Sequence, residues 1–340
     1  MKKLGAVLVS ALLLVAAAGA QDFPNPEAPP PDVSSHKKTE EQEPLQTFKA
    51  QVNVVSVFFN VKGPKGALIP GLTKDDFQVF EDGQPQTIKY FSASSDQPLT
   101  LGLMIDTSGS EQYMLEDERQ VASEFLRQVI RPNKDMAFLI SFDITVDLLQ
   151  DMTGSVADLK RGLAKTRINT GGGGGAMGVP GIGQGPVPIS RPKGTLLYDA
   201  VYLASHEELR NEVGRKALII LTDGADQGSH YRLNEAIEAA QKADAIVYVL
   251  LIWDPRYGNG DSEMSKLTNE TGGRVFAVGT NGKKMQQAFE QIGDELRSQY
   301  SIGYTPTNAK MDGSFRKIEI KAKGYKVQSR KGYYALPPRD

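Results

Sequence analysis

The sequence predicts a doubly wound α/β domain with a mostly parallel sheet and helices on both faces, at residues 97–299. Apolar runs such as LTLGLMID, KALIILTD and AIVYVLLIW alternate there with amphipathic stretches of helical period. The apolar runs are nearly continuous, which is typical of strands buried on both faces. Strands and helices that alternate in this way form parallel sheets covered by helices on both sides.

The composition indicates a folded chain without covalent cross-links. Of 340 residues, 40% are hydrophobic and 24% are charged, which allows one large domain and a smaller one. The absence of Cys excludes disulfides and a Cys-linked lipid, and it favours a bacterial envelope protein over a secreted eukaryotic one. Without Lys2 and Lys3 the chain has 37 basic and 41 acidic residues, so no basic field attracts nucleic acid or anionic lipid.

The N-terminus has the parts of a secretory signal peptide, predicted at residues 1–20. A charged start precedes an apolar stretch at Ala6–Ala17 and a small-residue cleavage site at Ala18–Ala20. A transmembrane anchor is the alternative, but the apolar run is shorter than the roughly 20 residues of a spanning helix. We expect an exported protein, periplasmic or extracellular, with no membrane span in the mature chain. Residues 21–46, rich in Pro, Glu, Lys and Ser, predict a flexible leader.

Both flanks of the α/β domain are predicted to be β-structure. Residues 47–96 form an N-terminal β module, in which runs such as VNVVSVFFNV and QTIKYFSA are separated by turn-forming KGPKG and EDGQP. Residues 300–340 form a C-terminal β segment with YSIGYTP, FRKIEIKAKG and KGYYAL. The N-terminal module is too small to be independent, so we expect the two flanks to pack on each other.

Oxygen-bearing side chains follow two of the buried strands. Asp106, Ser108 and Ser110 come directly after LTLGLMI, at the carboxyl end of a strand, where open α/β sheets bind ligands. Asp223 follows KALIILT, and Thr195 precedes a helix at the same predicted edge. A hard cation such as Mg²⁺ binds oxygen ligands, and one or two carboxylates with neutral hydroxyls meet that requirement. The pattern predicts a site for a divalent cation.

These residues resemble the metal-ion-dependent adhesion site of von Willebrand factor type A domains. That site consists, in chain order, of an Asp-x-Ser-x-Ser motif, a Thr from a second loop and an Asp after a central strand. The resemblance covers about Pro98–Arg297, and both flanks resemble those of a family of exported proteins common in acidobacteria. It implies the five ligands Asp106, Ser108, Ser110, Thr195 and Asp223.

The resemblance implies binding rather than catalysis. The cation, Mg²⁺ or Mn²⁺, would keep an open coordination position that an Asp or Glu carboxylate of a protein partner fills. The chain would then be a non-enzymatic module of adhesion or assembly in the bacterial envelope or outside the cell. No oligomeric state is predicted.

Two alternative functions use the same residues. In a hydrolase, Ser108 would need a His base, but His36 lies in the leader and nothing in the pattern singles out His206 or His230. Asp106-Thr107-Ser108-Gly109 also resembles the aspartic-protease signature, which requires a second such motif or a homodimer. In the second alternative the metal only stabilises the fold.

Four further features receive structural interpretations. The Gly-rich insertion at residues 171–185 lacks the Lys of a phosphate-binding loop, so it predicts a solvent loop on the rim of the site. Asp226 is expected to cap the helix that follows it, and Glu116–Glu118 to lie on a solvated helix face. The insertion lengthens the connection that leads to Thr195. If Thr195 is not a ligand, Asp199, four residues further on, is the carboxylate that could take its place.

Overall fold

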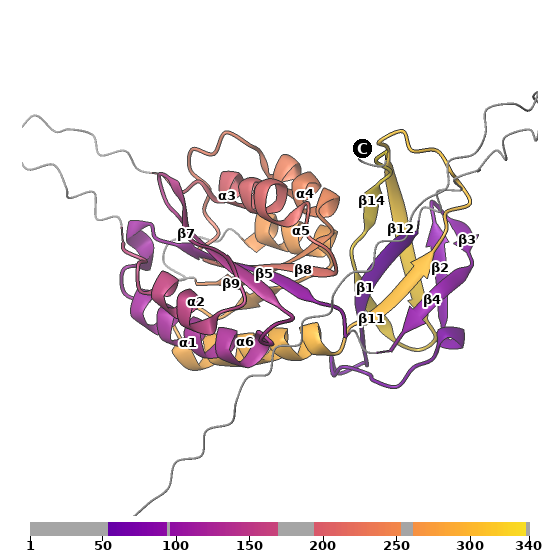
Figure 1. Ribbon diagram of the computed structural model, residues 1–340, viewed down its shortest axis with the longest axis horizontal. Coiled ribbons are helices and arrows are strands. Elements are labelled where there is room, and N and C mark those ends of the chain that lie inside the picture. Colours follow the sequence, from indigo (N-terminus) through magenta and orange to yellow (C-terminus); the bar gives the residue numbers. More distant parts are fainter. Residues whose placement is uncertain (1–53, 94–95, 169–193, 253–260, 338–340) are drawn as a thin grey trace, which may run out of the picture. The chain divides into compact units, whose positions relative to one another are not determined.

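The computed structural model describes residues 54–93, 96–168, 194–252 and 261–337 (Figure 1). The predicted signal peptide (1–20), the leader (21–46) and the Gly-rich insertion (171–185) lie outside the described residues. Within the described ranges, no helix has both the length and the apolar character needed to cross a membrane.

The centre of the α/β domain is a six-stranded sheet with the order β10-β9-β8-β5-β6-β7. Neighbouring strands are parallel except at the edge, where β7 is antiparallel to β6. The predicted doubly wound, mostly parallel fold is thus confirmed. The strands are β5 (Leu99–Asp106), β6 (Met136–Phe142), β7 (Val146–Thr153), β8 (Arg215–Thr222), β9 (Ala245–Leu251) and β10 (Val275–Ala277).

Helices cover both faces of this sheet, and Figure 1 shows α1, α2 and α6 on one side and α3, α4 and α5 on the other. All eight residues of β5 are buried. Leu103 and Ile105 belong to the core on the side of α1 and α6, and Met104 belongs to the core on the side of α3 and α4. The helices are α1 (Leu115–Val129), α2 (Val156–Leu163), α3 (Leu197–Leu203), α4 (Leu233–Lys242), α5 (Asp261–Thr271) and α6 (Gly282–Arg297), with short turns η2 (Gly109–Glu111) and η3 (Ala204–Leu209).

The two flanks of the chain share antiparallel sheets. One has the order β13-β1-β11-β4 and the other β14-β12-β2-β3, and both contribute to one core that includes Phe59, Ile302 and Ile318. Strand β1 pairs with both β11 and β13, so segments about 240–270 residues apart lie side by side. The elements are β1 (Val55–Lys62), η1 (Lys74–Asp76), β2 (Phe77–Glu81), β3 (Gln84–Gln86), β4 (Ile88–Ser92), β11 (Tyr300–Tyr304), β12 (Phe315–Ala322), β13 (Lys326–Ser329) and β14 (Gly332–Tyr334).

Gly102 at the middle of β5 allows the sheet to pack closely where it leads to the site. A Cβ at this position would lie 2.4 Å from Phe138 Cζ and 2.5 Å from Leu218 Cδ2. We therefore expect Gly102→Ala to lower the free energy of unfolding by about 1–3 kcal/mol, measured by urea denaturation. Gly109→Ala is the control because a Cβ there meets nothing within 4 Å. Equal midpoints for the two variants would contradict the packing argument.

Candidate metal site

Asp106 is the last residue of β5, and both of its carboxylate oxygens accept hydrogen bonds. Oδ1 accepts a hydrogen bond from the backbone N–H of Ser108 at 2.9 Å, and Oδ2 accepts one from the hydroxyl of Thr222 at 2.7 Å. Thr222 ends the neighbouring strand β8 and also accepts from the N–H of Gly224 at 3.0 Å. Asp106 therefore joins the loops that follow two adjacent strands.

Ser108 and Ser110 lie on the turn that follows, and their hydroxyl oxygens are 2.9 Å apart. Ser108 is half-buried and Ser110 is exposed. Neighbouring oxygen ligands of an octahedral cation with bonds of about 2.0–2.1 Å lie about 3 Å apart. The two hydroxyls thus have the separation of adjacent ligands, on a side of the site that solvent reaches.

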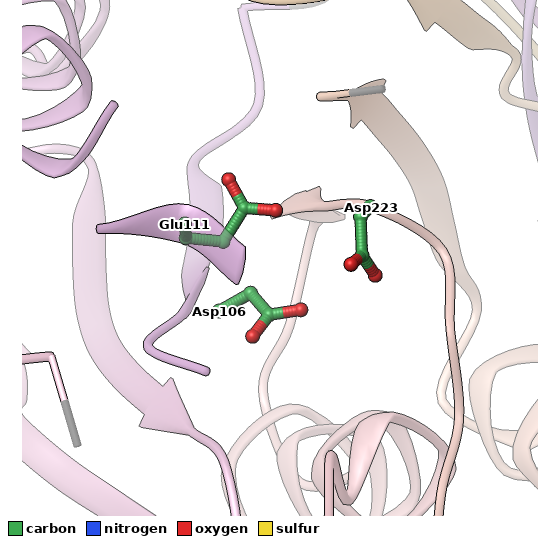
Figure 2. Close-up of side chains that lie close together, drawn as sticks. All are labelled: Asp106, Glu111 and Asp223. Atoms are coloured by element: carbon green, nitrogen blue, oxygen red, sulfur yellow. The ribbon is translucent and has the colours of Figure 1, made fainter. Parts of the chain in front are cut away.

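Three carboxylates converge at this edge of the sheet. Asp106, Glu111 and Asp223 each offer an oxygen, and the three oxygens lie within 4.8 Å of one another. Figure 2 shows the carboxylates facing one space, with Asp106 below the turn that carries Glu111 and with Asp223 opposite. Opposite ligands of a divalent cation are about 4–5 Å apart, so one ion could contact all three. The donor set, three carboxylates and two hydroxyls, suits a hard cation.

Glu111 was not among the ligands expected from the sequence, although it is only 1% exposed and its Oε2 has no hydrogen-bond partner. The expectation of a solvated face at Glu116–Glu118 is wrong for its last residue. Glu118 is 0% exposed, and neither of its carboxylate oxygens has a partner. The reason is helical period, since Glu118 lies three residues after buried Leu115 and four before buried Ala122.

The pKa values of these buried acids are shifted upward. Burial raises the pKa of Asp106 to about 6, against hydrogen bonds from Ser108 and Thr222 that lower it. Burial also raises the pKa of Glu111, and the charge of Glu118 raises it further. For Glu118, burial is again the first cause and the charge of Asp106 the second. The ionised carboxylates therefore oppose one another, and a bound cation would relieve that repulsion.

Thr195 lies on a loop that the backbone ties to the rest of the site. Its N–H and C=O pair with Gln227, four residues after Asp223, at 3.0 and 2.9 Å. The next residue, Leu196, donates its N–H to the backbone oxygen of Asp143 at 2.7 Å, and the Asp143 carboxylate accepts from the Thr107 hydroxyl at 3.2 Å. Three loops are thus connected, and Thr195 as a metal ligand stays a prediction.

Asp226 has a different role from the one expected. Its Oδ1 accepts from the N–H of Tyr198, in the first turn of α3, and from the Ser229 hydroxyl at 2.5 Å. The N-cap of α4, the helix that follows, is Arg232, so the predicted cap at that helix is wrong. Asp199 accepts from the N–H of Tyr231 at 2.8 Å, which fixes it towards the start of α4.

The two described histidines contact neighbours away from the serines. His206 stacks on Tyr202 and lies 2.7 Å from a Glu207 oxygen, while His230 packs edge-on against Tyr231. The Ser108 hydroxyl is instead paired with Ser110. Among the described residues, no hydrogen bond joins a histidine to Ser108.

No protein-family model matches the sequence, and no curated protein matches it. Solved structures with a similar fold include proximal thread matrix protein 1 from the mussel byssus with a zinc-occupied MIDAS motif, at 16% identity and a TM-score of 0.46, covering 64% of this chain and 50% of that one. BatB from Bacteroides thetaiotaomicron has 18% identity, a TM-score of 0.42, and coverage of 58% and 99%. The vWF domain of the type V pili tip protein Mfa5 from Porphyromonas gingivalis has 11% identity, a TM-score of 0.43, and coverage of 58% and 94%.

The chain spans about half of the length of the mussel protein. Its six-stranded, mostly parallel sheet with helices on both faces is consistent with the von Willebrand factor type A fold that the sequence resemblance implies. Identities to these three structures are at most 18% and TM-scores are below 0.5, so the likeness says nothing about the metal site of this chain.

Proposed function

We propose that this chain is a divalent-cation-dependent protein-binding module of the bacterial envelope or exterior, acting in adhesion or assembly. The observation that supports this most is the convergence of three carboxylates and two hydroxyls at the carboxyl edge of the central sheet. The ion would be Mg²⁺ or Mn²⁺, with Ser108, Ser110, Glu111 and Asp223 as direct oxygen ligands. Asp106 would bind through water or orient the serine hydroxyls.

The asymmetry of the site favours binding to an external carboxylate. Asp106 and Glu111 are buried beneath the proposed ion, whereas Ser110 is exposed. An ion held from below by carboxylates and flanked by hydroxyls would present its remaining coordination position to solvent. An Asp or Glu of a partner protein could fill that position, and its negative charge would be attracted by the cation.

An exposed aromatic residue beside the site fits a role in partner contact. Tyr113 is 85% exposed and lies two residues after Glu111, between the metal turn and α1. Tyrosine is over-represented among the residues that dominate binding energy at protein interfaces. We infer that Tyr113 contributes an apolar contact next to the carboxylate bridge.

A small carboxylate tests the bridge without knowledge of the partner. The chain is loaded with one equivalent of Mn²⁺ and mixed with acetate labelled with ¹³C at the carboxyl carbon. Pulsed electron–nuclear double resonance is expected to detect a ¹³C hyperfine coupling, because the carboxylate enters the shell of the bound ion. Acetamide, which has the same shape and no charge, is the matched control and should give no such coupling.

The control for the ion is Asp223→Ala, in which Mn²⁺ binding at this site is weakened and the acetate coupling should be lost. A wild-type chain that binds Mn²⁺ but shows no coupling at saturating acetate would refute the carboxylate bridge. The cation site would then stand with a structural role only.

A further inference from the structure

Glu111 and Glu118 form a buried acidic pair under the proposed cation. The two residues are 1% and 0% exposed. Three of their four carboxylate oxygens have no hydrogen-bond partner, namely Glu111 Oε2 and both oxygens of Glu118. Buried charged groups are normally paired, because leaving one unpaired costs several kcal/mol. A pair of this kind is compensated by a proton or by a cation.

The two carboxyl groups face each other. They lie within hydrogen-bonding reach of each other, the charge of Glu118 acts on Glu111, and the charge of Asp106 acts on both. Two ionised carboxylates cannot hydrogen-bond, since neither carries a donor. Either a shared proton or a cation must therefore lie between them.

The basic side chain next to Glu118 in the sequence, Arg119, forms its hydrogen bonds with other groups. Arg119 follows Glu118 in the chain, but its guanidinium donates to the Thr166 hydroxyl at 2.9 Å and to the Thr166 carbonyl at 2.7 Å. Its third hydrogen bond goes to exposed Glu116 at 2.8 Å. Arg119 therefore leaves the Glu118 oxygens without a partner.

The charge of the whole cluster exceeds what one ion can balance. Asp106, Glu111, Glu118 and Asp223 together carry four negative charges when ionised, and one divalent cation neutralises two of them. Two carboxylates within hydrogen-bonding reach of each other can both be ligands of one ion. Glu111 belongs to both groups, because it is part of the three-carboxylate cluster at the first site as well.

We propose that Glu111 and Glu118 bind a second divalent cation, behind the one at Asp106 and Asp223, with Glu111 shared between the two ions. This inference rests on the proposed cation site of the preceding section. The second ion would fix the turn that carries the serines to the start of α1. It would thereby hold the first site in its binding geometry before a partner arrives.

Manganese stoichiometry tests the proposal. The purified chain is dialysed to equilibrium against Mn²⁺, and bound metal is measured by elemental analysis. We expect two Mn²⁺ per wild-type chain and one in Glu118→Gln, a substitution that keeps the shape and removes the charge. Glu116→Gln is the matched control, since Glu116 lies on the same helix with its side chain 84% exposed, and it should bind two.

Electron paramagnetic resonance gives a second readout. Two Mn²⁺ ions that share a carboxylate are about 3.5–4 Å apart, so the wild type should show a spin-coupled spectrum. Glu118→Gln should show the six-line spectrum of an isolated ion.

One Mn²⁺ per wild-type chain would overturn the second site and leave the first. No bound Mn²⁺ would overturn both, and two in Glu118→Gln would overturn the role of Glu118. The wild-type result decides the stoichiometry even if the variant fails to fold, and Glu111→Gln, also expected to bind fewer than two, then replaces it.

Discussion

Asp223→Ala is expected to lower the affinity for Mg²⁺ and Mn²⁺ by about 100-fold or more, and Asp106→Ala by about 10–100-fold. Loss of a residue that only supports a metal ligand commonly costs 10–100-fold, and a direct carboxylate ligand should cost at least as much. Asp223 is the cleaner test, because its one protein hydrogen bond among the described residues is from the N–H of Ala225 at 2.9 Å. Calorimetric titration of both ions into the purified variants measures the effect.

The matched control is Asp226→Asn, in the same loop. Asp226 accepts hydrogen bonds from Tyr198 and Ser229, and an amide oxygen preserves both. We expect its cation affinity to match the wild type. Equal losses in Asp223→Ala and Asp226→Asn would mean that general negative charge, rather than this cluster, attracts the ion.

Asp106→Ala also separates a binding role from a purely structural one. Asp106 holds the Ser108 N–H and the Thr222 hydroxyl, so its removal should loosen both loops as well as the ion. If the metal only stabilised the fold, the variant would melt at a lower temperature with no separate loss of carboxylate binding. A loss of acetate coupling in folded protein supports the binding role.

The second large effect concerns the β-rich flanks, where Arg316→Met is expected to lower the free energy of unfolding by about 3–5 kcal/mol. Arg316 is 1% exposed and lies 3.4 Å from an oxygen of Glu81, which is itself buried. Its guanidinium also donates to the backbone oxygens of Asn308 and Lys310. Removing one partner of a buried ion pair leaves the other charge uncompensated, which accounts for the size of the loss.

Two tyrosine hydroxyls, from Tyr304 and Tyr333, donate to the other Glu81 oxygen at 2.8 and 3.1 Å and would remain in the variant. Urea denaturation followed by circular dichroism measures the loss. Lys321→Met on the same strand is the control, because its ion pair with Glu319 is half exposed and should contribute less than about 1 kcal/mol. Similar losses of unfolding free energy in both variants would show that the buried Arg316 pair contributes no more to stability than the exposed Lys321 pair.

The fold could be predicted because its signals are local. The buried strands are continuous apolar runs, and the helices between them have clear amphipathic period, so the alternation specifies the parallel sheet. The burial of Arg316 also follows from the alternation of a β-strand. Ile318, Ile320 and Ala322 on the same strand are buried, and Arg316 lies two residues before Ile318, on the same face. The exception is the helix expected after Thr195, where α3 passes into the π turn η3. No local pattern signals that change.

The candidate site could be predicted only in part. Asp106, Ser108 and Ser110 lie on one turn, so their spacing alone brings them together. Glu111 was missed because an acidic residue after a turn is normally exposed. Glu118 had a signal, its helical spacing from Leu115 and Ala122, but the acidic neighbours before it suggested a solvated face.

Backbone pairing between distant segments explains why the predicted role of Asp226 was wrong. The bridge between Thr195 and Gln227 brings the loop after β8 to the start of α3, and this places Asp226 on the Tyr198 N–H. Nothing near Asp226 in the sequence indicates a partner 28 residues earlier. Sequence reasoning therefore assigned Asp226 to the nearer helix.

The central claim is that a divalent cation binds at the carboxyl edge of the central sheet. Anomalous diffraction from crystals of the Mn²⁺-loaded chain tests it most directly. The account predicts an anomalous peak about 2–2.5 Å from oxygens of Ser108, Ser110 and Asp223. Fully loaded crystals with no peak at this edge, or with their peak elsewhere, would contradict it.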